Sequence, residues 1–170
     1  VDKSVNKPIR QQGHSLHQLE QDLGYKFKDA KLLKRALVHR SFSSEHNERF
    51  EFLGDGLLNF VIAEYLFSYL PDLEEGELSN LRAHFVREEM LCEIARTLNL
   101  GDYLILGLGE RKTGGAARPS LLADGLEAIF AAIYQDAGFE KSKLVILSLF
   151  KTRLNDAQRI KLADIKQDFK

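Results

Sequence analysis

Apolar residues recur along this chain mainly at the three- and four-residue spacing of amphipathic helices. These stripes predict helices over residues 14–23, 29–39, 46–70, 74–98, 119–136 and 141–154, the fourth divided near Arg87. Asp29 and the pair Ser43–Ser44 are candidate N-caps, and Pro71 is expected to end the third helix. No segment shows a convincing alternation of apolar and polar residues, so the pattern predicts an all-α fold.

The segments without helical periodicity set the expected boundaries. Residues 1–13 are polar and are expected to form a disordered tail, and residues 155–170 are polar and are expected to be a linker. Residues 102–117 contain four glycines among charged residues and are expected to form a mobile loop, which in proteins is often functional. The single domain is therefore expected over residues 14–154.

Composition removes several classes of protein. With 170 residues, 44% of them apolar, and a net charge of −1, the chain can form one compact domain and is not disordered throughout. Its longest apolar runs fall far short of the roughly 20 residues of a membrane span, and no export signal is present, so a cytoplasmic protein is expected. The near-neutral charge means that any polyanion must be held locally.

Cysteine, histidine and glycine patterns narrow the chemistry further. The single cysteine, Cys92, excludes an internal disulfide and a cysteine-rich zinc site, and its apolar neighbours predict an inert core thiol. The five histidines show no metal-binding spacing, so structural or surface roles are expected for them. The chain contains neither a Walker-type phosphate loop nor a Rossmann fingerprint, and no nucleotide cofactor is expected.

A few acidic residues occupy unusual positions. On the helix expected over residues 46–70, Glu48, Glu51 and Asp55 fall within an arc of about 60°, and the same stripe continues into core residues. On the helix over 119–136, Asp124 and Glu127 are the only charged residues between Leu121 and Tyr134. Most acids on helices are simply solvated, but two apolar helices that each carry such a group need a cation to offset burial costs of several kcal/mol.

The donor set selects the type of cation. Oxygen ligands without histidine or cysteine suit a hard divalent ion such as Mg²⁺, so a metal site between the two helices is predicted. Gly54, Gly56 and Gly125 are tolerable inside helices where backbones must approach closely, although packing alone also accounts for them. An oxygen-only Mg²⁺ cluster fits phosphodiester hydrolysis, and the residues therefore favour a hydrolytic nuclease.

The run Glu-Arg-Phe-Glu-Phe-Leu-Gly-Asp-Gly-Leu-Leu at residues 48–58 closely resembles the signature of the ribonuclease III family. Four further matches follow the family's order, at residues 37–41, 74–79, 109–115 and 122–128. The resemblance covers roughly residues 14–154 and is strongest to the bacterial enzymes. It implies the all-helical endonuclease domain of that family, acting as a homodimer on double-stranded RNA.

The resemblance also assigns roles to individual residues. Glu51, Asp124 and Glu127 match the family's metal ligands, with Asp55 as a further contact, and Asp55 and Glu127 match the catalytic pair. Two more acids, Glu48 and Glu75, match accessory acids that help to bind RNA or shape the site at the dimer interface. Gly56 and Gly125 stand where serine and threonine are usual, and both replacements could alter hydrogen bonds around the ligands.

The implied reaction uses Mg²⁺, with Mn²⁺ as a substitute, and leaves 5′-phosphate and 3′-hydroxyl ends with a short 3′ overhang. The family's substrates are precursors of ribosomal RNA and other structured transcripts, including messenger and transfer RNA. Bacterial members normally carry a C-terminal double-stranded-RNA-binding domain, to which residues 155–170 would be the linker. Two alternatives stay open: a non-catalytic dimeric RNA-binding or scaffold protein on the same fold, and a helical bundle whose acids pair with arginines.

Overall fold

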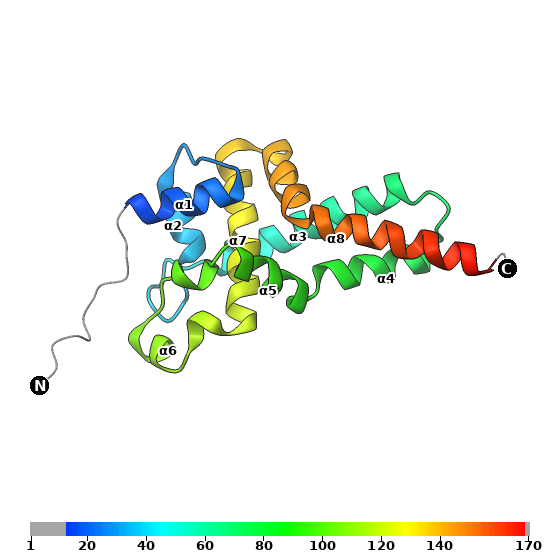
Figure 1. Cartoon of the computed structure of the whole chain (residues 1–170). Helices are drawn as coiled ribbons and strands as arrows, with labels where there is room; N and C mark the ends of the chain where they lie inside the picture. The colour runs from blue at the N-terminus through cyan, green and yellow to red at the C-terminus, as the bar shows by residue number, and fades with distance from the viewer. Residues whose placement is uncertain (1–12, 169–170) are drawn as a thin grey trace, which may run out of the picture.

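The computed structural model describes the backbone of residues 13–168 and the side chains of residues 16–157. The described part of the chain is helical and contains no strand, only an isolated parallel bridge between Val38 and Ile105, which confirms the predicted all-α class. Figure 1 shows the helices, with α7 running through the middle of the molecule. In chain order the elements are α1 (Gly13–Leu23), α2 (Ala30–Leu37), α3 (Glu48–Tyr69), α4 (Glu75–Val86), α5 (Glu88–Thr97), η1 (Leu100–Asp102), α6 (Leu108–Lys112), η2 (Gly115–Ala117), α7 (Pro119–Ala137) and α8 (Phe139–Asp168).

Most predicted helices form where the apolar stripes place them. The segment 74–98 divides into α4 and α5 because Arg87 adopts an extended backbone between them, with ψ of 156°. Asp29 caps α2 as predicted, since its carboxylate accepts a hydrogen bond from the backbone N–H of Lys31 at 3.0 Å. The prediction for α3 is wrong in detail: the helix begins at Glu48, and its N-cap residue is Asn47 rather than Ser43 or Ser44.

Asn47 occupies this position because it connects two helices. Its side chain is buried and donates a hydrogen bond from Nδ2 to the carbonyl of Ala36 at 2.9 Å, near the end of α2. Its backbone N–H donates to the carbonyl of Val38 at 2.9 Å. Ser43 and Ser44 lie four and three residues before this position and cannot make both contacts, so the start of α3 is fixed by tertiary structure.

The prediction that residues 102–117 form one loop is wrong. The segment folds into α6 and η2, which are held together by an ion pair between Glu110 and Arg118 at 2.6 Å. Arg111 donates from its guanidinium to the carbonyl of Leu104 at 3.2 Å. These short helices depend on polar contacts. The spacing of apolar residues, which predicted the other helices, therefore gave no indication of them.

The prediction for the C-terminal segment is wrong in part, and most of the predicted N-terminal tail lies outside the described residues. Helix α8 continues to Asp168, so its expected end near Leu154 is wrong, and most of the segment predicted as a linker is helical. Of the predicted tail, Gly13 begins α1, and residues 1–12 lie outside the described residues. Within the described part of the chain, no helix combines the length and the hydropathy needed to cross a bilayer.

Helix α7 forms the centre of the core. It packs against α2, α3, α5 and α8, and residues 122–133, apart from Asp124, are buried. Pro119 stands at its first position, where a missing N–H costs nothing. Cys92, on α5, is a buried free thiol, as predicted. The acids of α7 are therefore fixed on the most heavily packed helix of the fold.

The last turn of α7 holds the connection between α1 and α2. The carboxylate of Asp136 accepts hydrogen bonds from the hydroxyl of Tyr25 at 2.5 Å and from the backbone N–H groups of Lys28 and Asp29 at 2.8 and 3.0 Å. Burial raises the pKa of Asp136, but these hydrogen bonds lower it by more, and the pKa lies below its usual value. The charged form of Asp136 is therefore the one that stabilises this contact.

Replacing Asp136 by alanine is expected to lower the free energy of unfolding by about 1–3 kcal/mol at pH 7, because hydrogen bonds to a charged group are lost. Since the folded-state pKa is lowered, the contribution is present above the ordinary pKa near 3.8 and disappears as the pH falls through the folded-state value. Urea unfolding of both proteins at pH 7 and pH 3 measures this. An equal difference at the two pH values would contradict the assignment.

A candidate metal centre between two helices

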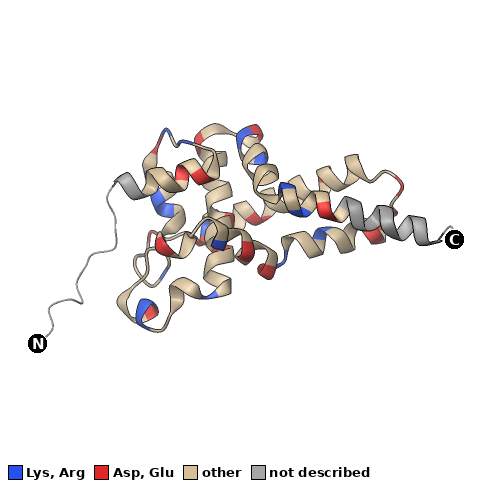
Figure 2. Cartoon of the chain, in the orientation of Figure 1, with Lys and Arg blue, Asp and Glu red and all other residues tan. Residues whose placement is uncertain are grey.

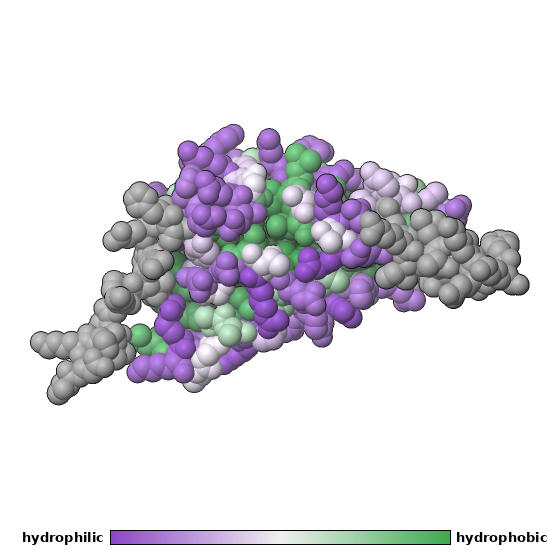
Figure 3. Space-filling view, in the orientation of Figure 1, coloured by the Kyte–Doolittle hydropathy of each residue, from purple (hydrophilic) through white to green (hydrophobic). Residues whose placement is uncertain are grey.

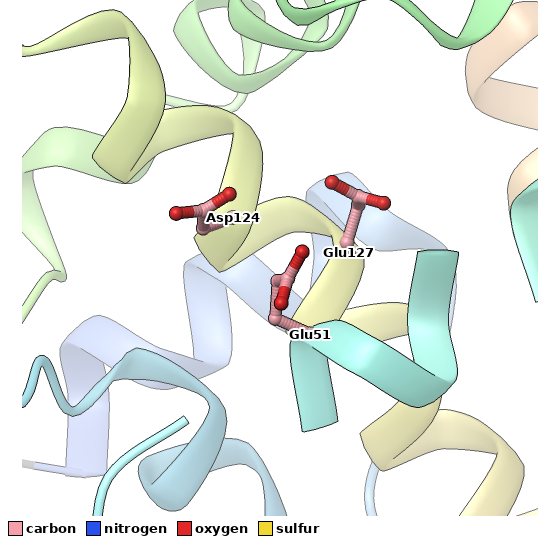
Figure 4. A group of neighbouring side chains, drawn as sticks. All are labelled: Glu51, Asp124 and Glu127. Carbon is pink, nitrogen blue, oxygen red and sulfur yellow. The ribbon is translucent and has the colours of Figure 1, made fainter. Parts of the chain in front are cut away.

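Three carboxylates from two helices converge at one point. Glu51 comes from α3, and Asp124 and Glu127 come from α7, one turn apart. Each offers an oxygen atom that lies within 4.8 Å of the others. Figure 4 shows the Glu51 side chain reaching between the two acids of α7. The prediction that acids from these two helices lie close together is therefore confirmed.

The two helices approach closely at Gly54. A Cβ atom placed there would overlap the backbone carbonyl oxygen of Glu127, so only glycine fits at this crossing. Gly54 lies one turn after Glu51 and is buried. The contact sets the distance between the helices at the point where their carboxylates meet.

The other two glycines do not mark a close approach of the backbones of α3 and α7, and Gly125 fits the alternative of side-chain packing. A Cβ on Gly125 would lie 3.1 Å from a methyl carbon of Leu104, so this glycine accommodates a side chain next to η1 rather than helix α3. A Cβ on Gly56 would meet no atom within 4 Å. The predicted role of Gly56 in close helix approach is therefore wrong.

Burial is uneven across the acids, which corrects the expectation of a uniformly apolar interior. Glu127 is 6% exposed, Glu51 is half-buried, and Asp124 and Asp55 are exposed. The centre therefore lies at the edge of the core, with one ligand inside and the others facing outward. A cation could enter without opening the fold, and it could keep water molecules on its open side.

Glu127 is the most perturbed group of the centre. Burial raises its pKa to about 9, helped by a hydrogen bond to the Asp55 carboxyl and by the charges of Asp55, Glu51 and Asp124. Its Oε2 atom is buried without a donor partner. A buried oxygen that accepts no hydrogen bond and faces three other acids is a position where a cation would replace a proton.

The two other ligand candidates are perturbed in the same direction. Burial first, and then the charges of Asp124, Asp55 and Glu48, raise the pKa of Glu51. Burial and the charge of Glu88 raise the pKa of Asp124, while His39 opposes this shift. All three groups would be stabilised in their charged form by one positive ion, and an all-oxygen set fits Mg²⁺ or a similar hard cation.

The remaining predicted acids are not part of this three-carboxylate cluster. Asp55 is near enough to Glu127 to raise its pKa, and the Asp55 carboxylate accepts a hydrogen bond from Nδ2 of Asn59 at 3.3 Å. Glu48 lines a cavity beside Glu51 and Asp124, and it pairs with Arg40 at 3.5 Å. Glu75 belongs to neither the cluster nor this cavity; its carboxylate accepts a hydrogen bond from the Ser79 hydroxyl at 2.8 Å.

The cavity beside the acids has a volume of about 220 Å³ and contains residues that the sequence did not mark as functional. His39 and Arg40 form part of its wall, together with Ser120 at the start of α7. The histidine lies in the matched segment 37–41, but nothing in its spacing indicated a position beside the metal centre. Figure 2 shows that acidic and basic residues alternate along the described helices.

Comparison with known proteins identifies the family. The family model described as ribonuclease-III-like matches residues 29–154, which include every acid of the centre. The chain belongs to this family. The family's curated members include ribonuclease 3 of Hahella chejuensis, 52% identical over 91% of this chain and 67% of that protein. Ribonuclease 3 of Dechloromonas aromatica is 58% identical over 79% of this chain and 60% of that protein.

A solved structure of the ribonuclease III family has the same fold as this chain. The nuclease domain of ribonuclease III from Campylobacter jejuni superposes with a TM-score of 0.79 at 48% identity, covering 81% of this chain and 96% of that one. That structure concerns flexibility in a region involved in dimer formation. The chain spans about 60–67% of the length of the curated relatives described here.

Proposed function

We propose that this chain is the catalytic domain of a divalent-metal-dependent endoribonuclease that hydrolyses double-stranded RNA. The observation that carries the proposal is the convergence of Glu51, Asp124 and Glu127 within 4.8 Å, with a buried oxygen of Glu127 lacking a donor. Membership of the ribonuclease-III-like family supports the substrate class. A cytoplasmic setting and the processing of ribosomal RNA precursors and other structured transcripts belong to the same proposal.

The proposed reaction assigns separate tasks to the acids. Glu51, Asp124 and Glu127 would hold Mg²⁺, or Mn²⁺ in its place, which when bound supplies positive charge for the developing charge on phosphate and lowers the pKa of water. Asp55 is exposed and would accept a hydrogen bond from the attacking water. The water oxygen bonds to phosphorus, the bond from phosphorus to O3′ breaks, and the proton passes to O3′. The products are 5′-phosphate and 3′-hydroxyl ends.

The proposal includes a homodimer, because α3 carries an uncovered apolar face. Phe52 is 81% exposed and borders a groove of about 540 Å³, whose wall also includes Phe60, Tyr134 and Phe139. Asp55 lines the same groove. A two-fold contact between two copies would cover the face and bring the two metal centres to one continuous surface, where each could cut one strand and leave a short 3′ overhang. Glu48 and Glu75 are proposed as accessory acids in this assembly.

Replacing Phe52 by aspartate is expected to raise the dissociation constant of the dimer by about 30-fold or more, because a central aromatic anchor is lost and a charge replaces it. Sedimentation velocity over a concentration series measures the change. Leu108, which is 75% exposed on α6, provides the matched control as Leu108→Asp, with no change expected. A Phe52→Asp protein that stays dimeric at the wild-type concentration would exclude this face.

A cleavage assay tests the proposed function directly. Duplex RNA with a label on one strand is incubated with the protein and Mg²⁺, with the protein and a chelator, and with Mn²⁺ in place of Mg²⁺. We expect endonucleolytic cutting with either metal ion, none with the chelator, and none of a matched DNA duplex. Metal-independent binding without cutting would instead support the RNA-binding or scaffold alternative.

A further inference from the structure

The backbone of His39 is held rigidly beside the metal centre. Its N–H donates a hydrogen bond to the carbonyl of Ile105 at 2.9 Å, and the N–H of Ile105 donates to the carbonyl of Leu37 at 2.9 Å. These two bonds form the parallel bridge between the end of α2 and the segment before α6. His39 is therefore positioned by two parts of the chain that are more than 60 residues apart in sequence.

Ser41 fixes which ring nitrogen of His39 carries the hydrogen. The backbone N–H of Ser41 donates to Nδ1 at 3.1 Å, and because an N–H can only donate, Nδ1 must be an acceptor. The Ser41 hydroxyl oxygen lies 2.7 Å from Nδ1 and itself accepts from the N–H of Gly107 at 2.9 Å, which leaves its own hydrogen to point at Nδ1. The ring hydrogen therefore resides on Nε2.

This Nε2–H group is an available donor at the cavity. His39 lines the cavity together with Glu48, Glu51 and Asp124, yet among the described residues its Nε2 has no hydrogen-bond partner. The neighbouring cation is already engaged, since Arg40 pairs with Glu48 at 3.5 Å. The Asn47 amide on the same wall donates to a backbone carbonyl. Among the described residues, the Nε2–H of His39 therefore has no hydrogen bond to the surrounding acids.

A ring N–H that Ser41 holds in place solves a problem specific to this site. The carboxylates repel a phosphodiester, and a lysine or arginine beside them would form an ion pair, as Arg40 does with Glu48. An imidazole N–H that is fixed in place can donate to a phosphate oxygen without neutralising the metal ligands. It also loses little conformational freedom when the substrate binds, since Ser41 already orients the ring.

We propose that His39 is a substrate-binding residue whose Nε2–H donates a hydrogen bond to a phosphate oxygen of the RNA backbone at the metal centre. The proposal rests on the proposed endoribonuclease function. The role of Ser41 is then to position the ring rather than to touch RNA. His39 contributes no metal ligand, so the metal centre and the substrate contact can be separated by experiment.

The test compares His39→Ala, His39→Gln, Ser41→Ala and the surface control His17→Ala with the wild type. We expect His39→Ala to lower kcat/KM for duplex RNA by about 10- to 100-fold, the effect of losing a hydrogen bond to a charged group. Glutamine can place an N–H near the position of Nε2 and should restore most of this loss. Calorimetric titration with Mn²⁺ in the absence of RNA should give the wild-type affinity within about twofold for all variants. His17→Ala should match the wild type throughout.

Three results would overturn the role of His39. The first is a wild-type kcat/KM in His39→Ala. The second is a loss of kcat/KM in Ser41→Ala as large as in His39→Ala, together with no rescue by His39→Gln, and the third is a loss of Mn²⁺ affinity in His39→Ala that parallels its loss of kcat/KM. The second result would show a purely structural role, and thermal unfolding of each variant would display it as a lower Tm. Failure of the wild type itself to cut duplex RNA with Mg²⁺ would overturn the proposed function instead.

Discussion

Replacing Glu127 by glutamine is expected to reduce cleavage of duplex RNA by about 10²- to 10⁴-fold and, in the same protein, to increase the stability of the metal-free state. If Glu127 holds the cation as proposed, activity is lost because the amide cannot supply a negative oxygen to that cation. The gain in stability follows because the buried acid has unfavourable neighbours in the absence of a cation. We expect a gain of about 1–3 kcal/mol in the free energy of unfolding at pH 7.

The pH dependence separates this explanation from a general packing effect. The pKa of Glu127 is raised from its ordinary value of 4.5 to about 9, so between these values the folded protein binds more protons than the unfolded chain. The stability of the metal-free wild type should therefore fall as the pH rises through this window, and Glu127→Gln should remove that part of the slope. Urea unfolding at pH 6 and pH 8.5 with a chelator present measures both proteins.

The control for Glu127 is an exposed acid on another helix. Glu89, 74% exposed on α5 and only loosely paired with Arg87 at 3.9 Å, provides it as Glu89→Gln. We expect that variant to keep full cleavage and an unchanged slope with pH. If Glu127→Gln cut RNA at the wild-type rate, Glu127 would not be a ligand or a catalytic group.

The second large effect is expected at Gly54, where alanine should lower the free energy of unfolding by about 3 kcal/mol or more. The added methyl group would overlap the carbonyl oxygen of Glu127, a backbone atom that cannot move without displacing α7. The helices would have to separate at the point where their carboxylates meet. Cleavage should therefore fall even under conditions where the variant remains folded, and divalent-ion affinity should fall with it.

Gly76 offers the matched comparison, since a Cβ placed there on α4 meets no atom within 4 Å. Gly76→Ala is expected to change stability by less than about 1 kcal/mol, the usual difference between glycine and alanine in a helix. Chemical denaturation of both variants, with Mn²⁺ titration of the folded fraction, gives the two quantities. A Gly54→Ala protein as stable as Gly76→Ala would show that this contact does not set the distance between α3 and α7.

The sequence predicts the parts of this protein that depend on local periodicity. The apolar stripes place α1, α2, α3 and α7 within a few residues, because each helix buries a continuous face. The meeting of Glu51 with the acids of α7 was also predictable, since both helices carry charge where apolar residues are expected. In these cases the residues within one helix are enough to predict where the helix lies and which of its faces is buried.

The errors arise where a distant part of the chain decides the outcome. Gly54 and Gly56 are equivalent in local sequence, but only one faces a backbone carbonyl of α7. The segment 107–117 is ordered by contacts such as that between Ser41 and Gly107, 66 residues apart. Helix α8 continues beyond Leu154 because residues 155–168 contain neither glycine nor proline, and good helix formers need no apolar stripe to extend an existing helix.

Apolar atoms also remain visible on the face shown in Figure 3, around the junction of α7 and α8, between polar side chains. Exposed apolar residues are normal on protein surfaces and indicate no site by themselves. The groove beside Phe52 differs from them because several aromatic residues line one concave surface next to Asp55.

The enclosed thiol of Cys92, only 2% exposed on α5, has a practical consequence. It is the chain's sole cysteine, so maleimide reagents should leave the native protein unlabelled, while a cysteine introduced at an exposed position would react selectively. Fluorophores attached in this way could follow the docking of one copy on another, and the arrival of nucleic acid, without first removing a background thiol.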